Sequence, residues 1–196
     1  MTDIKKLVES QRDYFHTHTT KSYEFRKTAL LNLHKAIKEH EAEIFEALKT
    51  DLNKCRFEAF ATEIGFVLEE ISHALKNLKD WMRVKKVTTP TVLHPASSLI
   101  YSDPLGVILI IAPWNYPFQL TLSPLVGAIA GGNTCIIKPS EFSSATSAVI
   151  NKIIAKTFRP EYLAVVQGAI KETQELLALK FDHILFTGST AVGKIV

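Results

Sequence analysis

The sequence is poor in cysteine and has no long apolar run, and each shortage excludes a class of protein. Its 196 residues include only two cysteines, Cys55 and Cys135, which is too few for a disulfide-stapled scaffold. The longest apolar run, 107–112, is far shorter than the roughly 20 residues of a membrane helix. Because the N-terminus also lacks the pattern of a secretion signal, we expect a protein of the reducing cytoplasm.

Glycine, proline and net charge are also modest. Glycine and proline contribute eight residues each, which excludes collagen-like and low-complexity chains. The 23 basic and 20 acidic residues leave a net charge of +3, and no five like charges are adjacent, so we expect no nucleic-acid partner. The seven histidines show no metal-site spacing, and we predict no metal centre.

The first 83 residues have the pattern of helices. Between Ile4 and Met82 there is no proline and one glycine. Apolar residues recur at intervals of three and four, which predicts amphipathic helices with one face on a core. The clearest stripe consists of Phe60, Ile64, Val67, Ile71, Leu75, Leu78 and Met82. We therefore expect a helical part over 1–83.

Residues 84–103 differ in character, because they are mostly β-branched, aromatic or proline. Proline is tolerated only where no ladder hydrogen bond is needed, so this segment is predicted to be extended at an edge. An arm that contacts another subunit and a simple linker fit the composition about equally well.

From residue 104 to residue 196, apolar runs alternate with helical patterns. Strands are expected at 107–111, 134–137, 163–166 and 183–186, with helices at 120–130 and 172–179 among those between them. This alternation predicts an α/β fold with a Rossmann-like parallel sheet. Ligands of such sheets lie beyond the carboxyl ends of the strands, so the residues that follow each strand are the candidate site.

The last of these loops, Gly188-Ser-Thr-Ala-Val-Gly193, allows a phosphate to approach free N–H groups. With Lys194 it is one residue short of a P-loop, because Ile195 lacks the hydroxyl that would bind Mg²⁺. A P-loop nucleotide hydrolase is therefore disfavoured. Dinucleotide binding and a purely structural turn stay open.

The other loops carry charged and amide side chains. Lys138 and Glu141 could bind a ribose diol, although spacing alone favours a surface ion pair. Asn115 lies in a rigid loop with two prolines and could stabilise an oxyanion, although an asparagine more often bonds its own turn. Cys135 lies within an apolar strand and is predicted to be a buried structural thiol.

Three phrases in this order resemble the aldehyde dehydrogenase superfamily. They are Pro104-Leu-Gly-Val…Ala112-Pro-Trp-Asn-Tyr-Pro-Phe118, Gly132-Asn-Thr…Lys138-Pro-Ser-Glu141 and Lys180-Phe-Asp-His-Ile-Leu-Phe-Thr-Gly-Ser189. The Trp-Asn-Tyr-Pro form is most similar to the class 3 branch, which includes fatty aldehyde dehydrogenases. The resemblance covers essentially the whole chain and implies that it is the N-terminal segment of such an enzyme, a truncated cofactor domain.

The resemblance also implies site residues. Asn115 matches the asparagine that stabilises the oxyanion. The positions that match cofactor-binding residues are Ile111, Ala112, Pro113, Trp114, Lys138, Ser140, Glu141, Gly168, Gly188, Ser189, Val192 and Gly193. Glu141 suggests NAD⁺, since a carboxylate repels the 2′-phosphate of NADP⁺, although this branch often accepts NADP⁺. Gln167-Gly-Ala169 departs from the usual Asn-Gly-Gly of the branch.

The family oxidises aldehydes to carboxylates with NAD(P)⁺, and residues 84–103 match its oligomerisation arm, so the longer enzyme is expected to be a homodimer with an aldehyde substrate. The nucleophilic cysteine and the glutamate base are expected beyond Val196, which predicts that the chain is inactive by itself. A non-catalytic nucleotide-binding or assembly module is the alternative.

Overall fold

A computed structural model describes residues 3–196. Four parallel strands form a sheet in the order β5-β4-β3-β6. Its strands are β3 (Val107–Ile111), β4 (Thr134–Lys138), β5 (Leu163–Val165) and β6 (His183–Phe186). The helices are α1 (Ile4–His16), α2 (Tyr23–Glu39), α3 (Glu41–Leu52), α4 (Arg56–Ala59), α5 (Gly65–Trp81), α6 (Gln119–Ala130), α7 (Ser144–Thr157), α8 (Ile170–Leu177) and α9 (Thr190–Gly193). The predicted α/β fold with a parallel sheet is confirmed.

The central strand β3 is buried along its whole length, and its side chains alternate between two cores. Ile108 and Ile110 face the core formed by α2, α3, α5, α6 and α7. Leu109 and Ile111 face a smaller core with residues from α1 and α8. Because neighbouring side chains point to opposite faces of a strand, a continuous apolar run suits a sheet covered on both sides.

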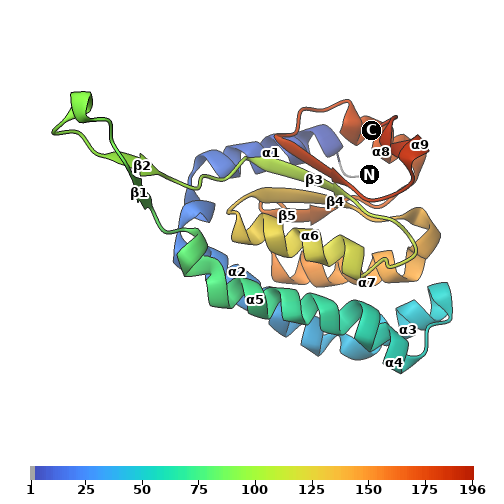
Figure 1. Ribbon diagram of the computed structural model, residues 1–196. Coiled ribbons are helices and arrows are strands. Elements are labelled where there is room, and N and C mark those ends of the chain that lie inside the picture. The colour runs from blue at the N-terminus through green and yellow to red at the C-terminus, as the bar shows by residue number, and fades with distance from the viewer. Residues whose placement is uncertain (1–2) are drawn as a thin grey trace.

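The helices before residue 84 do not form one layer. Figure 1 shows α1 on one face of the sheet, whereas α2 and α5 lie beyond α6 and α7 on the other face. Gln11 on α1 is fully buried and donates hydrogen bonds to the carbonyls of Cys135 and Pro160, which holds α1 against the sheet. The first helix therefore covers the face that the next four helices leave open.

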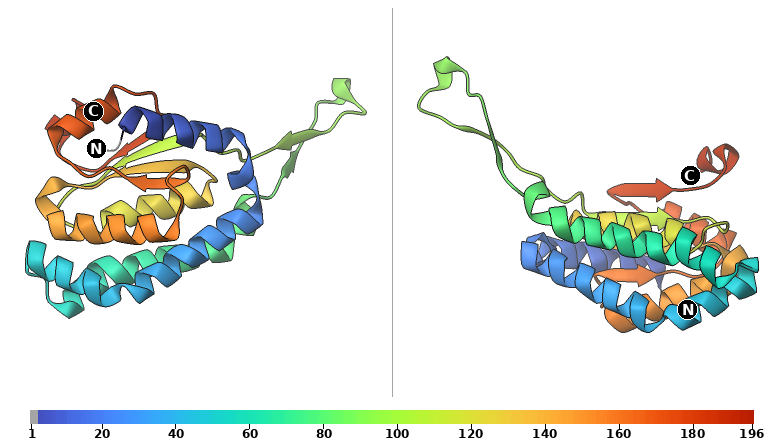
Figure 2. Two further views of the ribbon diagram at one scale, coloured as in Figure 1. Left: turned by 180° about the vertical axis from the view of Figure 1, so that it is seen from behind. Right: turned by 60° about the horizontal axis from the view of Figure 1, so that its bottom comes forward.

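Residues between α5 and β3 form an arm that projects from the body (Figures 1 and 2). Its strands β1 (Lys85–Val87) and β2 (Ser98–Ile100) pair antiparallel. A 3₁₀ turn at Thr91–Leu93 lies between the two strands. The arm exposes a set of large apolar side chains: Val87, Val92, Leu93, Leu99, Ile100 and Tyr101.

Two details of the helix prediction need correction. Phe60 was expected on the buried stripe but is 43% exposed, because Phe60–Ile64 forms a π-helical turn that changes the phase of the stripe. The helix expected at 172–179 is instead Ile170–Leu177. Its start is earlier because the Glu172 carboxylate accepts a hydrogen bond from Ala169 N, at 2.8 Å.

The first turn of α7 is capped by Asp51, an aspartate 94 residues earlier in the chain. Its carboxylate accepts hydrogen bonds from Ala145 N at 3.1 Å and from Thr146 N at 2.7 Å. A carboxylate at the positive end of a helix satisfies N–H groups that have no partner within the helix. This contact joins α3 to a helix that packs on the sheet.

We expect Asp51→Ala to lower the free energy of unfolding by about 1–2 kcal/mol, the usual effect of a lost cap. Chemical denaturation measures this change. Asp80→Ala, which removes an exposed carboxylate from α5, is the control and should change stability by less than about 0.5 kcal/mol. Equal effects of the two substitutions would show that the cap is unimportant.

Candidate functional site

The carboxyl ends of the parallel strands bring the predicted loops to one edge of the sheet. Backbone hydrogen bonds join them there: Ala112 N donates to Lys138 O at 3.1 Å, and Thr187 N donates to Ile111 O at 3.1 Å. Val166 N donates to Ile137 O at 2.9 Å. The loops after all four strands are thus held in fixed positions at this edge, where ligands of such sheets bind.

Lys138 is the last residue of β4 and is almost completely buried. Its Nζ lies 3.7 Å from Glu141 Oε2 and donates to Pro139 O at 2.8 Å. Burial lowers the pKa of Lys138, and the charges of Glu141 and Glu172 oppose that change. The predicted pair therefore forms, with a desolvated cation and a carboxylate that is partly open to solvent.

A cavity of about 370 Å³ lies beside this pair. Its lining comes from the segments after β4 and β5 and from the start of α7: Pro139, Ser140, Glu141, Ser144, Ser147, Ala148, Gln167, Gly168 and Ala169. Three predicted residues, Ser140, Glu141 and Gly168, therefore share one cavity. Its volume is in the range of small-molecule sites.

Glycine is required at position 168 of this cavity. Gly168 has φ of +140°, which side chains with a Cβ rarely adopt, and a Cβ there would lie 2.4 Å from Glu172 Oε2. The absence of a side chain keeps the cavity wall close to α8. The Glu141 carboxylate in its lining can accept hydrogen bonds from a hydroxyl-bearing ligand.

The other predicted cofactor residues lie on the far side of β4. Ile111 and Ala112 are buried, whereas Pro113 is half-buried and Trp114 is 53% exposed. Beyond β6, Ser189 Oγ accepts a 3.3 Å hydrogen bond from Val192 N at the start of α9. Gly188, Ser189, Val192 and Gly193 are all exposed and do not line the cavity beside Glu141.

Asn115 lies in the exposed loop after β3. Across residues 3–196 no hydrogen bond to its side-chain amide is found, whereas its backbone carbonyl accepts one from Lys54 Nζ at 3.3 Å. The amide therefore does not bond its own turn, which was the alternative interpretation, and it is free to donate to a ligand.

Lys54 and Glu63 are two residues that the sequence patterns did not indicate. They form a buried ion pair with a 2.5 Å contact beneath the Asn115 loop. Glu63 lies four residues before Val67, so a helical pattern places its carboxylate on the buried face of the stripe. A charged residue at a buried position of an apolar stripe is the sequence signal that could have indicated this ion pair.

Cys135 is fully buried in β4, and burial raises the pKa of its thiol well above the ordinary value. Cys55 is exposed. No group of three or more metal-ligating side chains occurs within the described part of the chain. Nor does any helix among those residues have the length and apolar character needed to cross a membrane.

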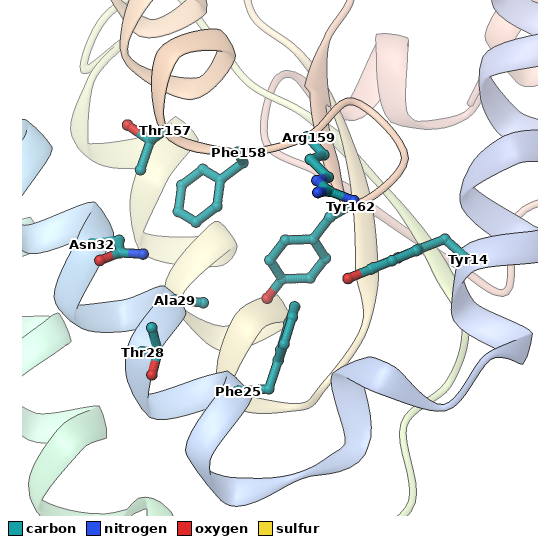
Figure 3. Close-up of a pocket in the computed structure, with 9 residues that line it drawn as sticks. All are labelled: Tyr14, Phe25, Thr28, Ala29, Asn32, Thr157, Phe158, Arg159 and Tyr162. Atoms are coloured by element: carbon teal, nitrogen blue, oxygen red, sulfur yellow. The ribbon is translucent and has the colours of Figure 1, made fainter.

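A second hollow of about 320 Å³ lies at the opposite end of the sheet, before β5 begins (Figure 3). Tyr14, Phe25 and Phe158 surround the ring of Tyr162 there, with Phe25 nearest at 4.9 Å between ring centres. This hollow is remote from the strand ends that carry the predicted residues, and it is not part of the candidate cofactor site.

Comparison with known proteins decides the family. The sequence-family model described as "Aldehyde dehydrogenase family" matches residues 1–196. The chain belongs to the aldehyde dehydrogenase family. Its predicted resemblance to class 3 members is confirmed, because relatives include aldehyde dehydrogenase family 3 members.

Similarity to individual aldehyde dehydrogenases agrees with this family assignment. The chain is 50% identical over 196 residues to 4,4'-diaponeurosporen-aldehyde dehydrogenase of Staphylococcus aureus (strain NCTC 8325 / PS 47), covering 100% of the chain and 43% of the relative. It is 42% identical to "Aldehyde dehydrogenase, dimeric NADP-preferring" of Canis lupus familiaris, with 100% and 43% covered. A structure of substrate-bound Staphylococcus aureus AldH superposes with a TM-score of 0.97 at 50% identity, again covering 100% and 43%. The chain thus spans less than half the length of these relatives.

Proposed function

We propose that these 196 residues form the cofactor-binding part of an enzyme that oxidises an aldehyde to a carboxylate with NAD(P)⁺ and water. The observation that carries the proposal is the cavity at the carboxyl edge in a member of this family, which Glu141 and Gly168 line, with Lys138 Nζ 3.7 Å from Glu141 Oε2. The dog relative, which is named as NADP-preferring, supports a nicotinamide cofactor.

In this proposal the loops at the strand ends bind different parts of the cofactor. Lys138 and Glu141 bind the adenosine ribose, with Ser140 and Gly168 in the cavity wall. The backbone of 111–114 and the turn Gly188–Gly193 bind the remainder of the cofactor. When bound, NAD(P)⁺ accepts a hydride from the substrate. The Asn115 amide donates a hydrogen bond to the oxyanion, which forms on the aldehyde oxygen when the aldehyde carbon is attacked. The amide is a fixed dipole, so it needs no reorganisation as this charge develops.

We assign the nucleophilic cysteine and the general base to the part of the relatives that this chain does not span. Cys135 cannot replace the nucleophile, because it is fully buried within β4 and its raised pKa keeps the thiol protonated. We therefore propose that these residues alone do not oxidise aldehydes.

The apolar arm suggests how the enzyme assembles. Six large apolar side chains are exposed on 87–101, more than an isolated monomer would leave open. We propose that the arm forms a homodimer contact, and the dog relative, which is named as dimeric, supports this role. The two free cysteines agree with a cytoplasmic location.

Calorimetric titration of the chain with NAD⁺ and with Mg·ATP tests the proposed function. We expect saturable binding of NAD⁺ and none of Mg·ATP, because Ile195 supplies no hydroxyl for Mg²⁺. Tight binding of Mg·ATP without binding of NAD⁺ would contradict the proposal.

The choice between cofactors should depend on Glu141. Glu141→Gln removes the negative charge of this side chain. The substitution weakens the repulsion of the 2′-phosphate of NADP⁺, and it also weakens the hydrogen bond that the side chain accepts from the ribose diol of NAD⁺. We expect the ratio of NAD⁺ to NADP⁺ affinity to fall by about two- to five-fold, the effect of a partly exposed charge. Titration with both cofactors measures the ratio, and Glu39→Gln on α2 is the control. An unchanged ratio would remove Glu141 from cofactor selection.

Asn115→Ala tests the oxyanion role in an enzyme that carries these residues together with the catalytic part. We expect kcat to fall by about 10²–10³-fold with little change in cofactor affinity, the usual effect of one oxyanion donor. Steady-state kinetics measure both values. Asn77→Ala on α5 provides the control, and an unchanged kcat in Asn115→Ala would remove this residue from the mechanism.

A further inference from the structure

A buried ion pair lies beneath the loop that presents Asn115. Lys54 follows α3 and is 7% exposed, and Glu63 belongs to the π-helical turn before α5 and is fully buried. Figure 1 shows α3 and α4 at the end of the molecule away from the arm. Both residues belong to the helical part of the chain before residue 84. In the sequence they lie more than 50 residues before the loop that they contact.

Each member of the pair holds a different end of the loop. Lys54 Nζ donates to the backbone carbonyl of Asn115 at 3.3 Å and lies 4.0 Å from the centre of the Tyr116 ring. Glu63 Oε2 accepts from the backbone N–H groups of Phe118 at 2.9 Å and Gln119 at 3.0 Å. Two charges that neutralise each other thus fix both the start and the end of 115–119.

The hydrogen bonding of the pair is nearly complete. Glu63 Oε1 accepts from Lys54, and Oε2 accepts from two N–H groups at the first turn of α6, which has no cap from its own N-cap side chain. The Lys54 ammonium donates to the Glu63 carboxylate and to the Asn115 carbonyl, and it also contacts the face of the Tyr116 ring. Burying two charges is costly unless their partners are supplied in this way.

From this geometry we infer that Lys54 and Glu63 are positioning residues, which set the location of the Asn115 amide at the sheet edge. The pair acts through the backbone of the loop and does not contact the substrate. A displacement of about 1 Å in a catalytic group can lower a rate 100-fold, so such a clamp has a direct consequence for the reaction. The inference rests on the proposed oxyanion role of Asn115.

Amide hydrogen exchange of the chain tests the clamp without any catalytic activity. In the double variant Lys54→Met/Glu63→Leu no unpaired charge stays buried, so the fold should persist while the loop loses its anchors. We expect exchange at Phe118 and Gln119 to accelerate by about 10- to 100-fold, the effect of losing hydrogen bonds to a charged group. Glu63→Gln should accelerate it less, and Lys54→Arg should retain protection.

The matched control is Lys152→Met, which breaks the exposed pair of Lys152 with Glu43 at 2.6 Å. Exchange in 115–119 should stay at its original rate in this variant. Unchanged exchange at Phe118 and Gln119 in the double variant would overturn the inference. An equal acceleration throughout β3 and β4 would also overturn it, because that result describes general destabilisation.

A kinetic cycle in an enzyme with the catalytic part then separates the two proposals. If the pair acts through Asn115, the double variant should lower kcat about tenfold at unchanged KM, and it should have no further effect in an Asn115→Ala background. Additive losses would overturn the positioning role. An Asn115→Ala enzyme with full kcat would contradict the proposed function instead, while the exchange result would still report on the clamp.

Discussion

The whole arrangement depends on the need to bury both faces of β3. Its five residues are all apolar and all buried, so helices must cover the sheet on each side. The chain meets this constraint by placing α1 and α8 on one face and α6 and α7 on the other, with α2, α3 and α5 behind them. Once the strands are parallel, their carboxyl ends fall on one edge and the loops that carry polar residues meet there.

Polar contacts between residues far apart in the sequence add to this apolar packing. Asp51 caps α7, and Glu63 supplies the partners of the first N–H groups of α6. Asn133 accepts hydrogen bonds from the backbone before β3, and Asp182 joins Val107 N to Arg12. Each contact satisfies backbone groups that packing would leave without a partner. The first two lie after β4 and β3, at the carboxyl edge, whereas the last two lie at the start of β3, at the opposite edge.

Much of this fold could be predicted from the sequence, because local patterns determine it. The apolar run 107–111 and the alternation after residue 104 predicted the strands, and the pairing of Lys138 with Glu141 followed from their spacing at the end of β4. The family motifs indicated the candidate residues. The roles of Lys54, Glu63 and Asp51 could not be predicted in this way, since they come from contacts across 55–95 residues. The same applies to Phe60, whose exposure follows from one π-helical turn.

We propose that the carboxyl edge of this sheet binds a nicotinamide dinucleotide. The most direct test is to map the backbone amide shifts of the chain as NAD⁺ is added to saturation. If this proposal is correct, the largest changes occur at 138–141, 167–169 and 188–193. Changes confined to the hollow around Tyr14 and Tyr162 at the opposite end of the sheet would contradict it, as would the absence of any change.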